Sequence, residues 1–297
     1  MDTISPNLPV PRAEVQLRLL SGGYLYLPMQ FFVQGANPNE VRKVPSMSWL
    51  IEHESGQRVI FDLGIRKDID AYPPAVYHRV QHIVKTEVVS DVVDGLTEIN
   101  LSTSDIDTVI FSHLHYDHVG NPSTFGVKTN FVIGPGAKQL ISEPSSYPQN
   151  PNSHYDARLL PIDRTTELPG STDRDFWSQL GPFPEAHDYF KDGSLFIVNA
   201  PGHCPGHINL LVRAASKWVL LAGDTSHDIG ILNGCCQTAS YIDDATGDLK
   251  HAHYNPELAE KHRERVWLFG RLENVEVILA HDHSAYEGLR CRYGSCG

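Results

Sequence analysis

Three histidines and one aspartate lie within the six residues 113–118 of this chain. Imidazole nitrogens and carboxylate oxygens are typical ligands of zinc, and the carboxylate extends the choice of metal toward iron or manganese. The apolar run 109–111 comes directly before these donors and predicts a buried strand that ends in them. A chance cluster is the competing interpretation, because the chain has 16 histidines among 297 residues. The dense alternation of donors directly behind one strand favours a metal site.

The same pattern of an apolar strand followed by a donor occurs three more times along the chain. These strands and donors are 195–198 with His203 and His207, 218–222 with Asp224, and 275–280 with His281 and His283. Strand ends in α/β architectures bring ligands together at one edge of a sheet. Four strands that each end in a donor therefore predict one composite site.

The elements that must position these donors are predicted from the alternation of polar and apolar residues. Residues 1–297 are expected to form one domain, with a polar, proline-containing tail at 1–12. The segment 143–185 contains seven prolines among many polar residues and is predicted to be a long irregular insertion. Strands are predicted at 13–20, 46–53, 58–62 and 130–133, and helices at 91–99 and 256–273.

Composition argues against several classes of partner. The formal charge of -12 and the pI near 5.7 disfavour a nucleic-acid partner, which requires a basic face. The chain has no run of about 18 apolar residues, and 1–12 lacks the pattern of a signal peptide, so we expect no membrane partner and a cytoplasmic location. Five scattered cysteines indicate free thiols rather than a disulfide framework.

The ordered donor set resembles that of the metallo-beta-lactamase superfamily. The resemblance rests on His113-x-His115-x-Asp117-His118, followed in order by His203, Asp224 and His281. It spans residues 15–285 and implies an α/β fold of the αββα sandwich type, with two sheets inside, helices outside and the metal site at one edge of the two sheets.

Residue by residue, the resemblance implies two metal sites. His113, His115 and His203 would bind the first metal, while Asp117, His118 and His281 would bind the second. Asp224 would bridge the two. The metals implied are two divalent ions, in the first place Zn²⁺, with iron, manganese or cobalt as alternatives.

Within the superfamily, the sequence around the ligands is most similar to N-acyl-homoserine lactone lactonases and to related fungal hydrolases. The resemblance implies that a hydroxide shared by two metals opens a lactone, for example an acyl-homoserine lactone in quorum quenching, and that Asp117 carries the proton to the leaving oxygen. An acyl-thioester hydrolase would share every ligand and is the main alternative. A lactam hydrolase and a mononuclear iron persulfide dioxygenase are less favoured. The expected partner is a small molecule, and homodimerisation is left open.

One position departs from the lactonase pattern. Those enzymes usually carry a tyrosine three residues after the bridging aspartate, where its hydroxyl contacts the substrate carbonyl, and this chain has His227 there. An imidazole can donate the same hydrogen bond, act as an acid, or cap the loop. A catalytic and substrate-binding role and a structural role are therefore both open.

Substrate contacts are sought in the apolar segment 24–33, which contains Met29, Phe31 and Phe32. This segment either packs in the core or lines an apolar pocket.

Other polar residues are expected to support the ligands rather than bind metal. Asp62 follows a predicted strand and is expected to orient nearby loops, with His207 and His283 in similar supporting positions. His251 and His253 lie in a polar stretch without a preceding strand. We expect this pair at the surface or at the rim of the pocket.

Overall fold

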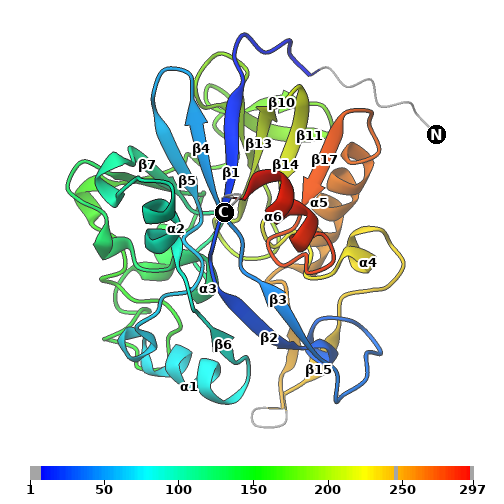
Figure 1. Cartoon of the computed structure of the whole chain (residues 1–297). Helices are drawn as coiled ribbons and strands as arrows, with labels where there is room; N and C mark the ends of the chain where they lie inside the picture. The colour runs from blue at the N-terminus through cyan, green and yellow to red at the C-terminus, as the bar shows by residue number, and fades with distance from the viewer. Residues whose placement is uncertain (1–7, 244–246, 295–297) are drawn as a thin grey trace.

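Two six-stranded sheets form the centre of the molecule in the computed structural model, which describes residues 8–243 and 247–294 (Figure 1). The first sheet has the spatial order β1 (Val15–Leu20), β4 (Ser48–His53), β5 (Arg58–Phe61), β7 (Thr108–Ile110), β8 (Asn130–Ile133) and β9 (Thr165–Glu167). The second has the order β10 (Ser178–Leu180), β11 (Phe183–Asp188), β12 (Leu195–Asn199), β13 (Ile208–Ala214), β14 (Lys217–Leu221) and β17 (Val275–Ile278).

Side-chain alternation along the strands separates the inner core from the outer layers. In β4, Trp49 and Ile51 pack between the sheets with residues of the second sheet, whereas Leu50 between them packs on the opposite face. This is the period of two that a strand with two covered faces requires. The outer face of the first sheet contacts α2 (Val92–Glu98), and that of the second contacts α5 (Pro256–Phe269). The expected αββα sandwich is confirmed.

Parallel pairing brings several strand ends to the same edge. Strands β5, β7 and β8 run parallel in the first sheet, and β14 and β17 run parallel in the second. The loops that follow β7, β14 and β17 therefore leave from corresponding edges, and they carry the donors of 113–118, Asp224 and His281. The fold positions donors from both sheets.

The segment 143–185 was predicted to be irregular, and this prediction is wrong in part. It contains β9 and β10 and the beginning of β11, so it forms the crossing from one sheet to the other. Trp177 anchors it between the sheets, where its indole N–H donates to the carbonyl of Pro169 at 2.9 Å. Strands of three residues are too short to show an alternation of polar and apolar residues. The prediction therefore rested on the prolines and gave an irregular segment.

A smaller three-stranded sheet stands beside the sandwich, in the lower part of Figure 1. It consists of β2 (Tyr24–Pro28), β3 (Val41–Pro45) and β6 (Thr86–Glu87), and a short 3-10 turn, Met29–Phe31, follows β2. The hairpin of β15 (Ser240–Ile242) and β16 (Leu249–His251) contributes Tyr241, whose ring centroid lies 4.6 Å from that of Phe31. The remaining helices are α1 (Pro74–His82), α3 (Tyr116–Val119), α4 (Ile229–Leu232) and α6 (Tyr286–Tyr293).

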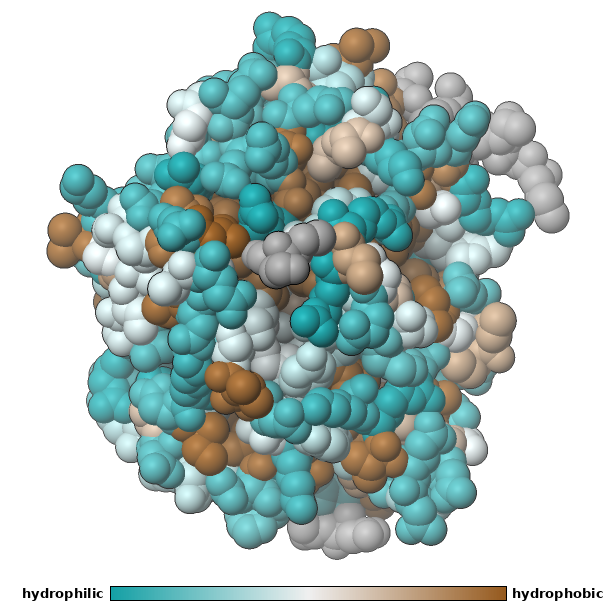
Figure 2. All heavy atoms as spheres, viewed as in Figure 1, coloured by the Kyte–Doolittle hydropathy of each residue, from teal (hydrophilic) through white to brown (hydrophobic). Residues whose placement is uncertain are grey.

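The polarity of the surface and the state of the described cysteines can be compared with what the composition predicts. The face in Figure 2 is mainly hydrophilic, with hydrophobic residues in separate small groups. Among the described residues, no helix is both long enough and apolar enough to cross a bilayer. Cys204, Cys235, Cys236 and Cys291 are free thiols, and Cys296 and residues 1–7 of the predicted tail lie outside the described residues.

Candidate metal centre

The loop after β7 and the one-turn helix α3 carry the donors of segment 113–118. Gly120 ends α3 with φ of +49°, and its N–H donates to the carbonyl of Gly64 at 2.8 Å. A Cβ at this position would lie 2.6 Å from the backbone oxygen of Leu63, so only glycine allows this close approach. The turn fixes α3 against the end of β5 and turns its donors toward the second sheet.

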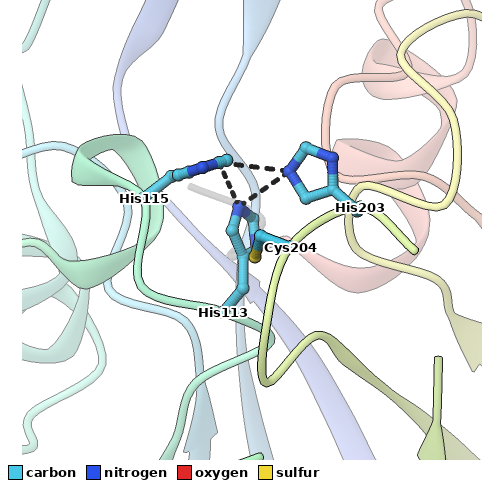
Figure 3. Close-up of side chains that lie close together, drawn as sticks. All are labelled: His113, His115, His203 and Cys204. Carbon is cyan, nitrogen blue, oxygen red and sulfur yellow. Dashed lines mark hydrogen bonds between the residues drawn. The ribbon is translucent and has the colours of Figure 1, made fainter. Parts of the chain in front are cut away.

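Three imidazole nitrogens converge from both sheets in the first cluster (Figure 3). His113 Nε2 lies 2.9 Å from His115 Nδ1, and His203 Nε2 lies 3.1 Å from His115 Nδ1 and 3.3 Å from His113 Nε2. A neutral ring nitrogen either donates or accepts, so hydrogen bonds alone cannot satisfy all three sides of this triangle. A cation can, because Zn–N bonds of about 2.0–2.1 Å in a tetrahedron separate the nitrogens by about 3.3 Å.

A second cluster lies beside the first and contains Asp117, His118 and His281. Asp117 Oδ2 is 3.5 Å from His281 Nε2 and 3.9 Å from His118 Nε2. His118 and His281 are buried, and within residues 8–243 and 247–294 His118 Nε2 forms no hydrogen bond of acceptable geometry. A buried ring nitrogen left without a partner is costly, and a bound cation would satisfy it.

Asp224 lies between the two clusters and faces each with one carboxylate oxygen. Oδ1 is 3.2 Å from His118 Nε2 and 3.3 Å from His281 Nε2. Oδ2 is 3.4 Å from His203 Nε2 and 3.8 Å from His113 Nε2. Although burial raises the pKa of Asp224, the neighbouring imidazoles lower it well below its usual value. The group is therefore a carboxylate with the geometry of a bridge.

Donor chemistry, burial and unpartnered atoms together fit two divalent cations. The seven predicted ligands come together from four separated segments, and in the described part of the chain Asp224 Oδ1 also lacks a hydrogen bond of acceptable geometry. Cys204 lies beside the first cluster (Figure 3). Burial raises the pKa of its thiol well above the usual value. The seven histidine and aspartate ligands account for both clusters without this cysteine.

A pocket of about 230 Å³ opens onto the clusters. Phe31 and Phe32 line it, as predicted for the apolar segment 24–33. Met29 does not, because the 3-10 turn directs it into the core, where it is 1 % exposed, and its assignment to the substrate site is corrected. Leu25 and Leu27 of the same segment and Tyr155 of the segment 143–185 also line the pocket. Arg79, Tyr241 and Lys250 line it as well and were not predicted.

A family model described as the Metallo-beta-lactamase superfamily matches residues 41–271. The chain belongs to this superfamily. Curated relatives include the cytochrome P450 monooxygenase mpaDE of Penicillium roqueforti, which is 30% identical over an alignment of 304 residues that covers 93% of this chain and 34% of that protein. The chain thus spans about a third of that relative's length, and 27% of the related mpaDE' protein of Penicillium brevicompactum.

Two further relatives are named as hydrolases of a single substrate class. A gamma-lactamase of Gibberella moniliformis is 34% identical over 176 residues, which cover 58% of this chain and 72% of that protein. The N-acyl homoserine lactonase AttM of Rhizobium radiobacter is 26% identical over 228 residues, which cover 73% of this chain and 78% of that protein.

Solved structures share the fold of this metallo-beta-lactamase chain. The structure of an AiiA variant of B. thuringiensis with N-decanoyl-L-homoserine bound matches with a TM-score of 0.66 and 17% identity, over 93% of this chain and 96% of that one. AidC, a dizinc quorum-quenching lactonase, matches with a TM-score of 0.57 and 13% identity, over 93% of this chain and 91% of that one.

Asp62 supports the second cluster of this superfamily member. Its Oδ1 accepts from the backbone N–H of Ser112 at 2.7 Å, and its Oδ2 accepts from the Ser112 hydroxyl at 2.7 Å. The same Oδ2 lies 2.8 Å from His118 Nδ1, which must be the protonated nitrogen of that ring. Asp62 therefore turns the free lone pair of His118 toward Asp224, which is how carboxylates orient metal-binding histidines.

His207 supports the loop that carries Asp224. Its Nδ1–H donates to the carbonyl of Ala200 at 2.8 Å, and its Nε2 accepts from the backbone N–H of Asp224 at 3.1 Å. Both bonds require a neutral ring, in keeping with burial, which lowers the pKa of His207 to about 4. The placement agrees with the expected supporting role.

His283 does not support the site, and that prediction is corrected. Its side chain is exposed, because the turn after β17 directs the neighbouring Asp282 inward instead. Asp282 Oδ1 accepts from the backbone N–H of Ser284 at 2.9 Å and of Ala285 at 3.0 Å. In such a turn, the side chain two positions after a predicted ligand can point inward or outward, so its direction does not follow from the spacing.

His253 was expected at the surface or pocket rim, but it is buried at 7 % exposure. Its Nδ1 lies 3.1 Å from Nδ1 of His203. The backbone N–H groups of Tyr254 and Asn255 donate to the carbonyls of His203 and Gly202, each at 2.8 Å, and hold the two segments together. In the sequence, the one sign that this stretch has a defined position is Asn255 followed by proline. This pair forms the N-cap and first residue of α5.

His227 faces the centre rather than only its own loop. Its Nε2 lies 3.1 Å from Asp224 Oδ2, and its ring packs against Phe32 with centroids 5.0 Å apart. Among the residues that the structure describes, none forms a hydrogen bond with its Nδ1. The side chain also lines the pocket.

Proposed function

We propose that this metallo-beta-lactamase chain is a metal-dependent hydrolase that opens a lactone, with two divalent ions, in the first place zinc, in its centre. The observation that carries the proposal is the position of Asp224, whose two oxygens each face a separate buried cluster at the floor of a pocket. Two such ions would polarise a carbonyl and lower the pKa of a water molecule, which supplies hydroxide at neutral pH.

Asp117 is suited to move the proton in this reaction. Its Oδ2 faces His281 at 3.5 Å, and the residue lines the pocket floor. The carboxylate takes a proton from the attacking water and gives it to the ring oxygen as the bond from the carbonyl carbon to that oxygen breaks. Water and lactone together become one hydroxy acid.

His227 stands where it can donate a hydrogen bond to the substrate carbonyl. The ring is held on one side by Phe32 and on the other by Asp224. An N–H aimed at a carbonyl stabilises the negative charge that develops on its oxygen during attack. We assign His227 this role in place of the tyrosine of the lactonases.

Similarity to named hydrolases supports a cyclic substrate. The lactonase AttM and the solved lactonases share the fold, and a gamma-lactamase shares 34% identity over part of the chain. A lactam is therefore the second candidate, since amide and ester hydrolysis need the same polarised carbonyl. The substrate proposed is a small molecule, because the pocket measures about 230 Å³.

A substrate panel tests this function. Metal-loaded protein would be assayed with lactones of several ring sizes and acyl lengths, with matched lactams, and with acyl thioesters, while metal content is measured on the same sample. We expect two metal equivalents and turnover of lactones. Turnover confined to thioesters, or one metal equivalent in fully active protein, would contradict the proposal.

A further inference from the structure

Arg79 is a cation in the candidate active-site pocket, and no described carboxylate pairs with it. It lies in the last turn of α1 and lines the pocket. The nearby Arg66 and Arg158 each have an aspartate at 2.8 Å. Within 8–243 and 247–294, Arg79 forms no such ion pair. Asp117 and Asp224 also line the pocket, but both belong to the proposed metal centre. The guanidinium is therefore available to an anionic ligand.

Arg79 shares its pocket with residues of the metal centre. The predicted ligands His115, Asp117 and His281 line the pocket together with Arg79. The guanidinium therefore borders the space in which a substrate would meet the metal centre.

Apart from Arg79, the histidines and the carboxylates of the metal centre, the pocket has an apolar wall and a further cation. Leu25, Leu27 and Phe31 form the wall. The cation is Lys250, and its ammonium lies 3.2 Å from Asp248. The volume of about 230 Å³ is below the usual range of about 300–1,000 Å³ for small-molecule sites. Such a pocket suits a compact ligand with one anionic group rather than a large polyanion.

We propose that Arg79 binds an oxyanion of the substrate, so that the lactone opened here carries a free carboxylate. The inference rests on the proposed lactone hydrolysis. The planar guanidinium presents paired N–H groups that match the two oxygens of a carboxylate, and the pair would hold the substrate at a second point away from the reacting carbonyl. A phosphate has the same chemistry and is distinguished from carboxylate by the test.

The test compares a butyrolactone that bears a free carboxylate with its methyl ester and with a phosphate-bearing butyrolactone. Metal-loaded wild type, Arg79→Met and Arg79→Lys are assayed beside Arg158→Met, which removes an arginine already paired with Asp156. We expect wild type to prefer the acid over the ester by about tenfold in kcat/KM, through KM. Arg79→Met reduces that ratio to about one, Arg79→Lys gives an intermediate ratio, and Arg158→Met keeps it.

The possible results distinguish a failure of the proposed role of Arg79 from a failure of the proposed lactone hydrolysis. If lactones are hydrolysed but wild type does not distinguish acid from ester, or Arg79→Met keeps the preference, the inference about Arg79 is wrong and lactone hydrolysis stands. A preference for the phosphate-bearing lactone overturns the carboxylate assignment. If no lactone is hydrolysed, the proposed function fails, and calorimetric binding of the carboxylated lactone to wild type and Arg79→Met decides whether Arg79 binds an oxyanion.

Discussion

The Nδ1 atoms of His203 and His253 lie 3.1 Å apart in the buried wall of the metal centre. Nε2 of His203 faces the first cluster, so a metal bound there would place the ring proton on Nδ1, where His253 would accept it. A metal-binding histidine more often donates to a carboxylate or a backbone carbonyl. Here a second imidazole, brought in by the segment before α5, takes that place.

His253→Leu removes this acceptor, and we expect it to weaken metal binding by about 10- to 100-fold. His253→Asn, which keeps an acceptor oxygen near the Nδ1 position, weakens it less. Competition with a chromophoric chelator measures both affinities. His251→Leu is the control for loss of an imidazole from the same segment. His251 accepts from the backbone N–H of His253 and lines the pocket, but within residues 8–243 and 247–294 it forms no hydrogen bond with a predicted ligand, so its loss should weaken metal binding much less. Equal affinities for wild type and His253→Leu would remove His253 from the centre.

His227→Phe should lower kcat by about 10²- to 10³-fold, the usual cost of losing one donor to a developing oxyanion. His227→Tyr should recover most of the rate, because a phenol can donate the same hydrogen bond. Both variants should keep two metal equivalents, measured by elemental analysis. Undiminished turnover of His227→Phe would assign the residue to the structure of its loop.

Acid should destabilise the protein through His262. Burial lowers the pKa of this histidine to about 3 from its usual 6.5, while its Nε2 lies 2.7 Å from Asn209 Oδ1. The unfolded chain therefore binds the proton first as the pH falls, and the stability present above pH 6.5 is progressively lost toward pH 3. Between pH 7 and pH 5 this amounts to about 2 kcal/mol.

His262→Gln, which keeps a donor but cannot titrate, should reduce that pH dependence by about 2 kcal/mol. Urea unfolding at pH 5 and pH 7, at one fixed metal concentration, measures the difference between variant and wild type. Protonation of the metal ligands affects both proteins and cancels. Parallel pH profiles for the two proteins would contradict the assignment.

Trp177→Ala should cost about 3–5 kcal/mol in the free energy of unfolding, because it empties a buried site between the sheets and frees the Pro169 carbonyl. Chemical denaturation measures this value. Trp267→Ala, at a half-buried position on α5, is the control and should cost distinctly less. A loss of similar size at both sites would show that segment 143–185 is not anchored through Trp177.

The donors that directly follow a strand could be predicted from the local sequence. An apolar run and the type of residue that comes after it can both be recognised within a short stretch of the chain. The segment 113–118, Asp224 and His281 follow apolar runs, and the parallel pairing that unites them follows from the fold class. Met29 was misplaced because alternation stops at the end of β2, where a 3-10 turn decides which neighbour points inward. Arg79 and His253 escaped prediction since only tertiary contacts bring them to the site.

The donors of the centre are divided between the two sheets, with 113–118 behind β7 of the first and His203, Asp224 and His281 behind strands of the second. A metal ion that contacts residues of both sheets would bind only when the two sheets are packed together, so its binding free energy would add to the free energy of unfolding. Metal supply would then govern how long the folded chain persists as well as how fast it works. A bound metal would therefore link the two sheets of the molecule.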